Sequence, residues 1–127
     1  MSEYSISLVS SILSGPIEVS IIVPNPRIGE NAEQFYRKGE EYKILWLLHG
    51  GDGDRNDWLR NTSINRYVQG RNVIVVIPSA LNSDFANHQQ FAGGYNYSDF
   101  FFGELMPFIY NWFPVSNDPK DSFLAGF

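Results

Sequence analysis

The sequence predicts an α/β fold in which an antiparallel β-hairpin is followed by parallel strands joined by helices. Apolar and polar residues alternate over residues 4–12 and 17–23, which is the period of half-buried strands. Residues 44–48 (ILWLL) and 73–77 (VIVVI) are instead unbroken apolar runs. Unbroken runs are typical of parallel strands that are covered by helices on both faces. The predicted order of elements is β-β-β-α-β-α-β.

The hairpin is predicted from its turn and its end. Ser14-Gly15-Pro16 is a turn signal between the two alternating runs. In the second run, Glu18 and Ser20 lie on the face opposite the aliphatic residues. Pro24 and Pro26 end that strand, because proline cannot donate to a ladder. The polar residues 27–42 that follow are expected to form a surface connection.

The first crossover helix is predicted between the two apolar strands. Residues 61–63 (NTS) offer N-cap side chains, and Gly70 is a suitable C′ residue. Ile64, Tyr67 and Val68 are expected to share one helical face.

The second crossover helix is expected to be capped by Ser98, to kink at Pro107 and to end at Pro114. Its apolar face is predicted from the helical spacing of five residues: Phe101, Leu105, Phe108, Ile109 and Trp112. A turn at residues 117–119 leads to the last strand, residues 122–125.

Composition and charge limit the function classes. The 127 residues fit one domain, and the net charge of −5 disfavours nucleic acid or an anionic membrane surface as a partner. There is no cysteine, which excludes disulfides and thiolate catalysis. No segment has the apolar length of a membrane span, and the first 15 residues lack the features of a signal peptide. We expect a soluble, cytoplasmic protein.

A glycine-rich segment follows the first parallel strand, at the sheet edge where open α/β folds bind ligands. Residues 49–54 read HGGDGD. Such glycines either form a simple turn or let backbone amides approach a phosphate or an oxyanion. The segment is neither a G-x-G-x-x-G fingerprint nor a P-loop, so nucleotide binding is disfavoured.

Histidines and carboxylates near this segment are candidates for catalytic or metal-binding groups. His49 is either a base or, more simply, a residue that fixes the loop by hydrogen bonding. The cluster of Asp52, Asp54 and Asp57 lacks the EF-hand spacing, and His88 has no neighbour at ligand spacing. We therefore predict no metal site. Trp58 is expected to anchor the loop.

Four segments resemble one family. They are residues 47–68 (LLHGGDGDRNDWLRNTSINRYV), 77–85 (IPSALNSDF), 102–115 (FGELMPFIYNWFPV) and 123–127 (FLAGF). Together they resemble the putative esterase family of the α/β-hydrolase fold, which includes tributyrin esterases, S-formylglutathione hydrolases and some acetylxylan and feruloyl esterases. The resemblance runs from about Val19 to Phe127. It implies the N-terminal portion of a three-layer α/β-hydrolase sandwich.

The resemblance implies a serine carboxylesterase that acts on short acyl esters or thioesters through an acyl-enzyme, with no cofactor or metal. The backbone N–H of Gly51 would be one oxyanion-hole donor. Three residues would shape the loop: His49, Gly50 and Trp58. Three residues of the long segment 79–97 would border the small-molecule substrate: Phe85, Phe91 and Tyr95.

The same resemblance implies that residues 1–127 are a single partial domain. Gly126 would be the first glycine of a G-x-S-x-G nucleophile elbow, with the serine after Phe127 and the acid and histidine later still. The 127 residues alone are then expected to be inactive. Two alternatives stay open. One is a non-catalytic fragment or binding module, whose free strand edge would favour a homo-oligomer. The other is a flavodoxin-like nucleotide binder.

Overall fold

The computed structural model describes residues 1–127 except 38, 40, 81–84, 86, 89–94 and 127. Its main sheet has five strands in the order β1-β2-β4-β3-β7, and a second sheet pairs β5 with β6. The strands are β1 (Ser2–Ser10), β2 (Gly15–Val23), β3 (Lys43–Leu48), β4 (Val73–Pro78), β5 (Asn87–His88), β6 (Tyr95–Asn96) and β7 (Ser122–Gly126).

Strand pairing confirms the predicted hairpin followed by parallel strands. β1 is antiparallel to β2, and β2 is antiparallel to β4. β3 lies between β4 and β7 and is parallel to both. The two unbroken apolar runs are thus the two neighbouring central strands, where side chains on both faces are covered.

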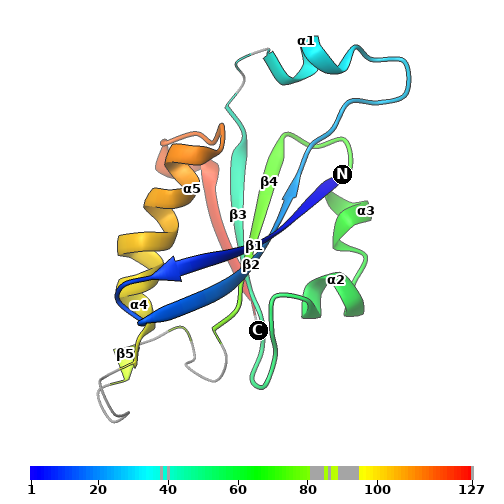
Figure 1. Cartoon of the computed structure of the whole chain (residues 1–127). Coiled ribbons are helices and arrows are strands. Elements are labelled where there is room, and N and C mark those ends of the chain that lie inside the picture. Colours follow the sequence, from blue (N-terminus) through cyan, green and yellow to red (C-terminus); the bar gives the residue numbers. More distant parts are fainter. Residues whose placement is uncertain (38, 40, 81–84, 86, 89–94, 127) are drawn as a thin grey trace.

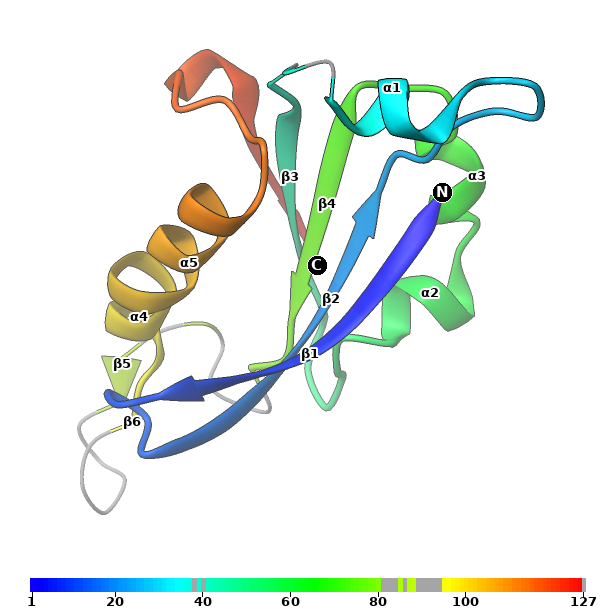
Figure 2. The same ribbon diagram turned by 45° about the horizontal axis from the view of Figure 1, so that its top comes forward.

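Helices cover both faces of the sheet (Figure 1). On one side lie α2 (Asp57–Asn61) and α3 (Ile64–Val68), and on the other lies a continuous stretch of α4 (Tyr97–Phe100), the π-helix η1 (Phe101–Leu105) and α5 (Met106–Trp112). The connection between β2 and β3 carries α1 (Ala32–Arg37), and the 3₁₀-helix η2 (Pro119–Asp121) precedes β7. Figure 2 shows α1 beside the amino-terminal ends of β3 and β4, away from the loop that follows β3.

Two apolar clusters hold the three layers together. The larger one packs α4, η1 and α5 against one sheet face and includes Ile44, Trp46 and Phe101. The smaller one packs α2 and α3 against the other face and includes Leu47 and Val75. Adjacent residues of β3 therefore enter opposite clusters, as the alternation of side chains along a strand requires.

The second crossover helix differs from its predicted form. It begins at Tyr97, so that the predicted cap Ser98 lies inside its first turn, and Trp112 is 76% exposed rather than on the buried face. The reason lies in the π-helical turn, in which the N–H of Met106 donates to the carbonyl of Phe101 five residues back. The turn lies directly before Pro107, which has no N–H to donate.

The π-turn also explains the spacing of the buried residues. Besides Phe100, which is also fully buried, they recur every fourth position: Tyr97, Phe101, Leu105 and Ile109. In a pure α-helix each four-residue step overshoots one turn by about 40°, so a row of four would drift off the sheet. The wider π-turn absorbs that drift. It shifts the register of later residues, and Trp112 consequently leaves the face that a regular 3.6-residue period assigns to it.

Smaller differences concern the surface. Residues 27–42, predicted as a plain connection, contain α1, which buries none of its residues. Tyr67 is exposed, so it does not share the buried face of Val68. α3 begins at Ile64, directly after the cap candidate Ser63, whose side chain makes no capping hydrogen bond in the described part of the chain. Gly70 has φ +76°, the left-handed conformation expected of its C′ position.

Candidate active site

The carboxyl ends of the three parallel strands meet at one end of the molecule (the lower end in Figure 1). There Gly126 of β7 is paired with Leu48 of β3. A Cβ atom on Gly126 would lie 2.9 Å from the Cβ of Leu48 and 3.0 Å from its carbonyl oxygen. Only glycine permits this approach, which brings the end of β7 directly beside the start of the loop at residues 49–54.

His49 begins that loop and is held on both sides of its ring. The N–H of Ala80 donates to Nε2 over 2.9 Å, which makes Nε2 an acceptor and places the proton on Nδ1. Nδ1 in turn donates to the carbonyl oxygen of Gly50 over 2.8 Å. The ring is only 3% exposed. Both nitrogens are thus engaged in holding the backbone, and neither is available for proton transfer to a ligand in this arrangement.

The glycines give the loop its tight path. The N–H of Gly53 donates to the carbonyl of Gly50 over 3.1 Å, and a Cβ atom on Gly53 would collide with the carboxylate of Asp57. Asp52 closes the turn at φ 57°. Gly51 is exposed, and no heavy atom of the described residues lies within 4 Å of where its Cβ would be. Among the described residues, the side of Gly51 on which a Cβ would lie is therefore open.

Two side chains join the loop to α2 and to β3. Asp54 Oδ1 accepts the N–H of Asn56 over 2.7 Å, and this bond, with smaller contributions from Arg60 and Arg55, lowers the pKa of Asp54 below its usual 3.8. Trp58 donates its indole N–H to the carbonyl of Leu48 over 2.8 Å and is partly buried. The indole thus ties α2 to the last residue of β3.

The sequence reasoning missed a set of polar contacts around Arg55. Its main-chain N–H donates to Ser79 Oγ over 2.9 Å, and its Nη1 donates to Ser20 Oγ over 2.8 Å. Its Nη2 lies 3.5 Å from Glu18 Oε2. The sequence feature that could have indicated these contacts is Ser20, a polar residue in an otherwise aliphatic stretch of β2. Ser20 is fully buried in the fold. Buried hydroxyls need a partner, and a nearby arginine is one of the few that can reach.

The expected pocket residues are only partly described. Phe85 has φ 56°, and its ring centroid lies 4.9 Å from that of His49 and 5.4 Å from that of Tyr97. It therefore packs against the ring that starts the glycine loop. Phe91 lies outside the described residues, and for Tyr95 the backbone in β6 is described but the side chain is not. Their predicted roles in substrate binding stay predictions.

The described residues contain no group of three or more His, Cys, Asp or Glu side chains placed to hold a metal ion. In the same part of the chain, no helix combines the length and the apolarity that crossing a bilayer requires.

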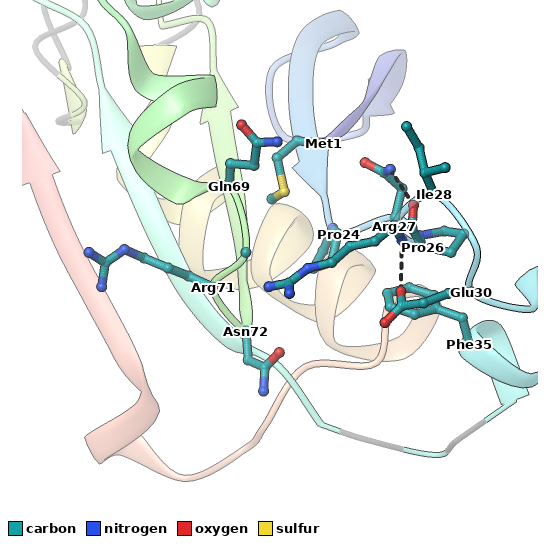
Figure 3. A pocket seen from close by; sticks show the side chains of 12 residues that line it. Met1, Pro24, Pro26, Arg27, Ile28, Glu30, Phe35, Gln69, Arg71 and Asn72 are labelled. Carbon is teal, nitrogen blue, oxygen red and sulfur yellow. Dashed lines mark hydrogen bonds between the residues drawn. The ribbon is translucent and has the colours of Figure 1, made fainter.

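A hollow of about 660 Å³ lies at the other end of the sheet, between the segment after β2 and the residues before β4 (Figure 3). Arg27 extends into it, with its Nη2 3.2 Å from where a Cβ of Gly70 would be. Arg71 donates its Nε–H to the carbonyl of Tyr67. This hollow is remote from the strand ends that carry the glycine loop, so we assign the candidate site to the loop.

The fold and the strand-end loop define an α/β-hydrolase, as comparison with known proteins bears out. The model of the Putative esterase family matches residues 10–127, and the chain belongs to that family. An acetyl esterase of Caldicellulosiruptor saccharolyticus is 30% identical over 87 residues, which cover 68% of this chain.

Two solved structures from Staphylococcus aureus share the fold. The chain is 26% identical to an S-formylglutathione hydrolase with a TM-score of 0.78, and 27% identical to fluorophosphonate-binding serine hydrolase F with a TM-score of 0.83. Each match covers 98% of this chain and 46% of the other. The acetyl esterase is covered over 32% of its length. The chain thus corresponds to the N-terminal portion of an α/β-hydrolase domain.

Proposed function

We propose that the protein is a serine carboxylesterase that hydrolyses short acyl esters or thioesters through an acyl-enzyme. Family membership supports ester hydrolysis in general. The proposal of a serine acyl-enzyme rests on the position of the glycine loop. Leu48, which comes just before the loop, is paired with Gly126 at the end of β7, and Gly51 in the loop is exposed. In the proposed protein a nucleophilic serine comes two residues after Gly126, in a G-x-S-x-G elbow.

The reaction would proceed in two half-reactions. The serine Oγ attacks the carbonyl carbon while a histidine takes its proton, and the carbonyl oxygen becomes an oxyanion. The C–O or C–S bond then breaks, the histidine returns the proton to the leaving alcohol or thiol, and the acyl group stays on the serine. Water attacks this ester in the same way and releases the carboxylic acid. The serine, the histidine and its acid partner are proposed to lie beyond residue 127.

Within residues 1–127, the N–H of Gly51 would stabilise the oxyanion, together with the amide that follows the serine. Backbone donors fixed before the reaction stabilise developing charge without reorganisation, and one such donor can be worth about 10²–10³ in rate. His49, Gly50 and Trp58 would act through the shape of the loop. Phe85, beside His49, would form part of the wall of the acyl or alcohol pocket.

Short acyl groups are favoured by the names of the relatives, an acetyl esterase and an S-formylglutathione hydrolase. Both names describe the hydrolytic removal of very small acyl groups, acetyl in one and formyl in the other. We therefore propose formyl- and acetyl-sized substrates.

A second candidate is a non-catalytic binding module that retains this part of the fold. It is favoured by β7, whose neighbouring residues Phe123 and Leu124 point to opposite sheet faces and are 48% and 66% exposed. Apolar surface on both faces of an edge strand favours association with another chain or segment.

Hydrolysis of p-nitrophenyl acetate by the full-length protein tests the proposal. We expect turnover that a serine-directed fluorophosphonate abolishes, and no turnover from a polypeptide of residues 1–127 alone. The absence of turnover by the full-length protein across acetyl esters and S-formylglutathione would reject the esterase in favour of the binding module. Light scattering on the 127-residue polypeptide would then report whether it self-associates.

A further inference from the structure

The loop at residues 49–54 is held at both of its ends by two consecutive residues after β4. Ala80 donates its N–H to the ring of His49, where the loop begins. Ser79 accepts the N–H of Arg55, where the loop ends. Ser79 is itself fixed, because its N–H donates to the carbonyl of Glu18 and its carbonyl accepts the hydroxyl of Tyr97.

Arg55 extends this attachment to β2. Its guanidinium reaches Ser20 over 2.8 Å and Glu18 over 3.5 Å, and its side chain is only 19% exposed. Ser20 is completely buried, so its bond to the guanidinium is shielded from water. A charge-assisted bond in such surroundings is stronger than one on the surface, and its loss would leave a buried hydroxyl without this partner.

We propose that Arg55 is a positioning residue that locks the glycine loop onto β2 and β4, and so fixes the direction of the Gly51 N–H. This inference rests on the proposed esterase function for its catalytic consequence, whereas the locking itself does not. An oxyanion donor accelerates a reaction only when it is oriented beforehand, and a misplacement of about 1 Å can cost about 10²-fold in rate. Arg55 makes no contact with substrate in this account and acts through the loop.

Three variants of the full-length protein isolate the side chain. Arg55→Met removes the guanidinium and keeps the length and the main-chain bond to Ser79. Ser20→Ala removes the acceptor, and the double variant tests whether the two act as one unit. Arg37→Met is the matched control, because Arg37 is 78% exposed and pairs with Glu33 across one helical turn.

Kinetics on p-nitrophenyl acetate give the first readout. For Arg55→Met we expect kcat to fall about 10- to 100-fold with KM within about threefold, since the oxyanion forms only in the transition state. The affinity for a boronic acid that forms a tetrahedral adduct with the serine should fall by a factor similar to the loss in kcat. The double variant should lose no more than Arg55→Met alone, and Arg37→Met should match the parent. A folded Arg55→Met protein with kcat within twofold of the parent overturns the proposal.

Amide hydrogen exchange of the peptide that covers residues 49–56 gives the second readout, which does not depend on activity. We expect exchange about tenfold faster in Arg55→Met than in the parent or the control. If the parent fails to hydrolyse esters, the proposed function is wrong, and exchange alone decides the locking role. Unchanged exchange in a folded Arg55→Met protein overturns it.

Discussion

Gly51 offers a perturbation that removes a single N–H group. Gly51→Pro deletes the proposed oxyanion donor, and Gly51→Ala keeps it while adding a methyl group. The structure makes the alanine a fair control, because no heavy atom of the described part of the chain lies within 4 Å of the position of the new Cβ, and Gly51 is not among the glycines with positive φ. The residue before the proline would be Gly50, which tolerates the restriction that proline imposes on its predecessor.

The expected size of the effect follows from the chemistry of the donor. Loss of one oxyanion-hole donor costs about 10²–10³ in kcat, which corresponds to about 2.7–4 kcal/mol of transition-state stabilisation. Substrate binding does not need the oxyanion, so KM should change little. For Gly51→Ala we expect kcat within about threefold of the parent, because a methyl group that faces open space neither removes a donor nor meets a neighbour.

The assay compares both variants of the full-length protein with the parent on p-nitrophenyl acetate, together with thermal unfolding to show that each is folded. Circular dichroism should show equal secondary structure in all three proteins. A folded Gly51→Pro protein that keeps kcat within threefold of the parent would refute the oxyanion role. Equal losses of kcat in the proline and alanine variants would refute the oxyanion role as well, because only the proline variant lacks the N–H.

Three further predictions concern stability and pH. Glu104→Ala should destabilise the protein by about 2 kcal/mol in urea unfolding, because the Glu104 carboxylate accepts hydrogen bonds from one hydroxyl and two main-chain N–H groups at the β1–β2 turn. The exposed control Glu33→Ala should cost under about 0.5 kcal/mol. The fold lowers the pKa of Asp54, mainly through the hydrogen bond from the main-chain N–H of Asn56. The charged carboxylate therefore stabilises the folded protein at pH values above the unfolded-state pKa, near 3.8, and this stabilisation is lost as the pH falls through the lower folded-state pKa. In urea titrations, Asp54→Asn should therefore destabilise the protein more at pH 7 than at pH 3. Equal losses of unfolding free energy at the two pH values would contradict the lowered pKa of Asp54. Gly126→Ala should cost about 1–3 kcal/mol by forcing β7 away from β3. Gly15→Ala should be nearly neutral in the same titration, because the new Cβ meets no described residue within 4 Å.

The strands were predictable because their side-chain periods are simple. A strand that is apolar on both faces, such as residues 73–77, is stable only where both faces are buried. The structure places this strand in the centre of the sheet. The second crossover helix was predicted less well. A π-turn changes the number of residues per turn locally, and no apolar pattern of period 3.6 records that change, so Trp112 was assigned to the wrong face.

The candidate site was predictable where glycine and histidine follow a strand directly. The segment at residues 49–54 lies at a strand end, and its place in the fold follows from the parallel order alone. The contacts that hold it were not predictable, because they join distant parts of the chain. Nothing in the sequence near Arg55 points to Ser20, 35 positions earlier, or to Ser79, 24 positions later.

These distant contacts bear on how the proposed site is assembled. His49, Arg55 and Trp58 are bound by β2, by the end of β3 and by the two residues after β4, all of which belong to residues 1–127. The glycine loop therefore takes its shape from the same elements that form the two apolar clusters, and it needs no contact with the proposed serine to do so. Because its shape is built into the sheet, the first oxyanion donor would stand ready before any substrate binds, which is the condition under which a backbone amide contributes most to catalysis.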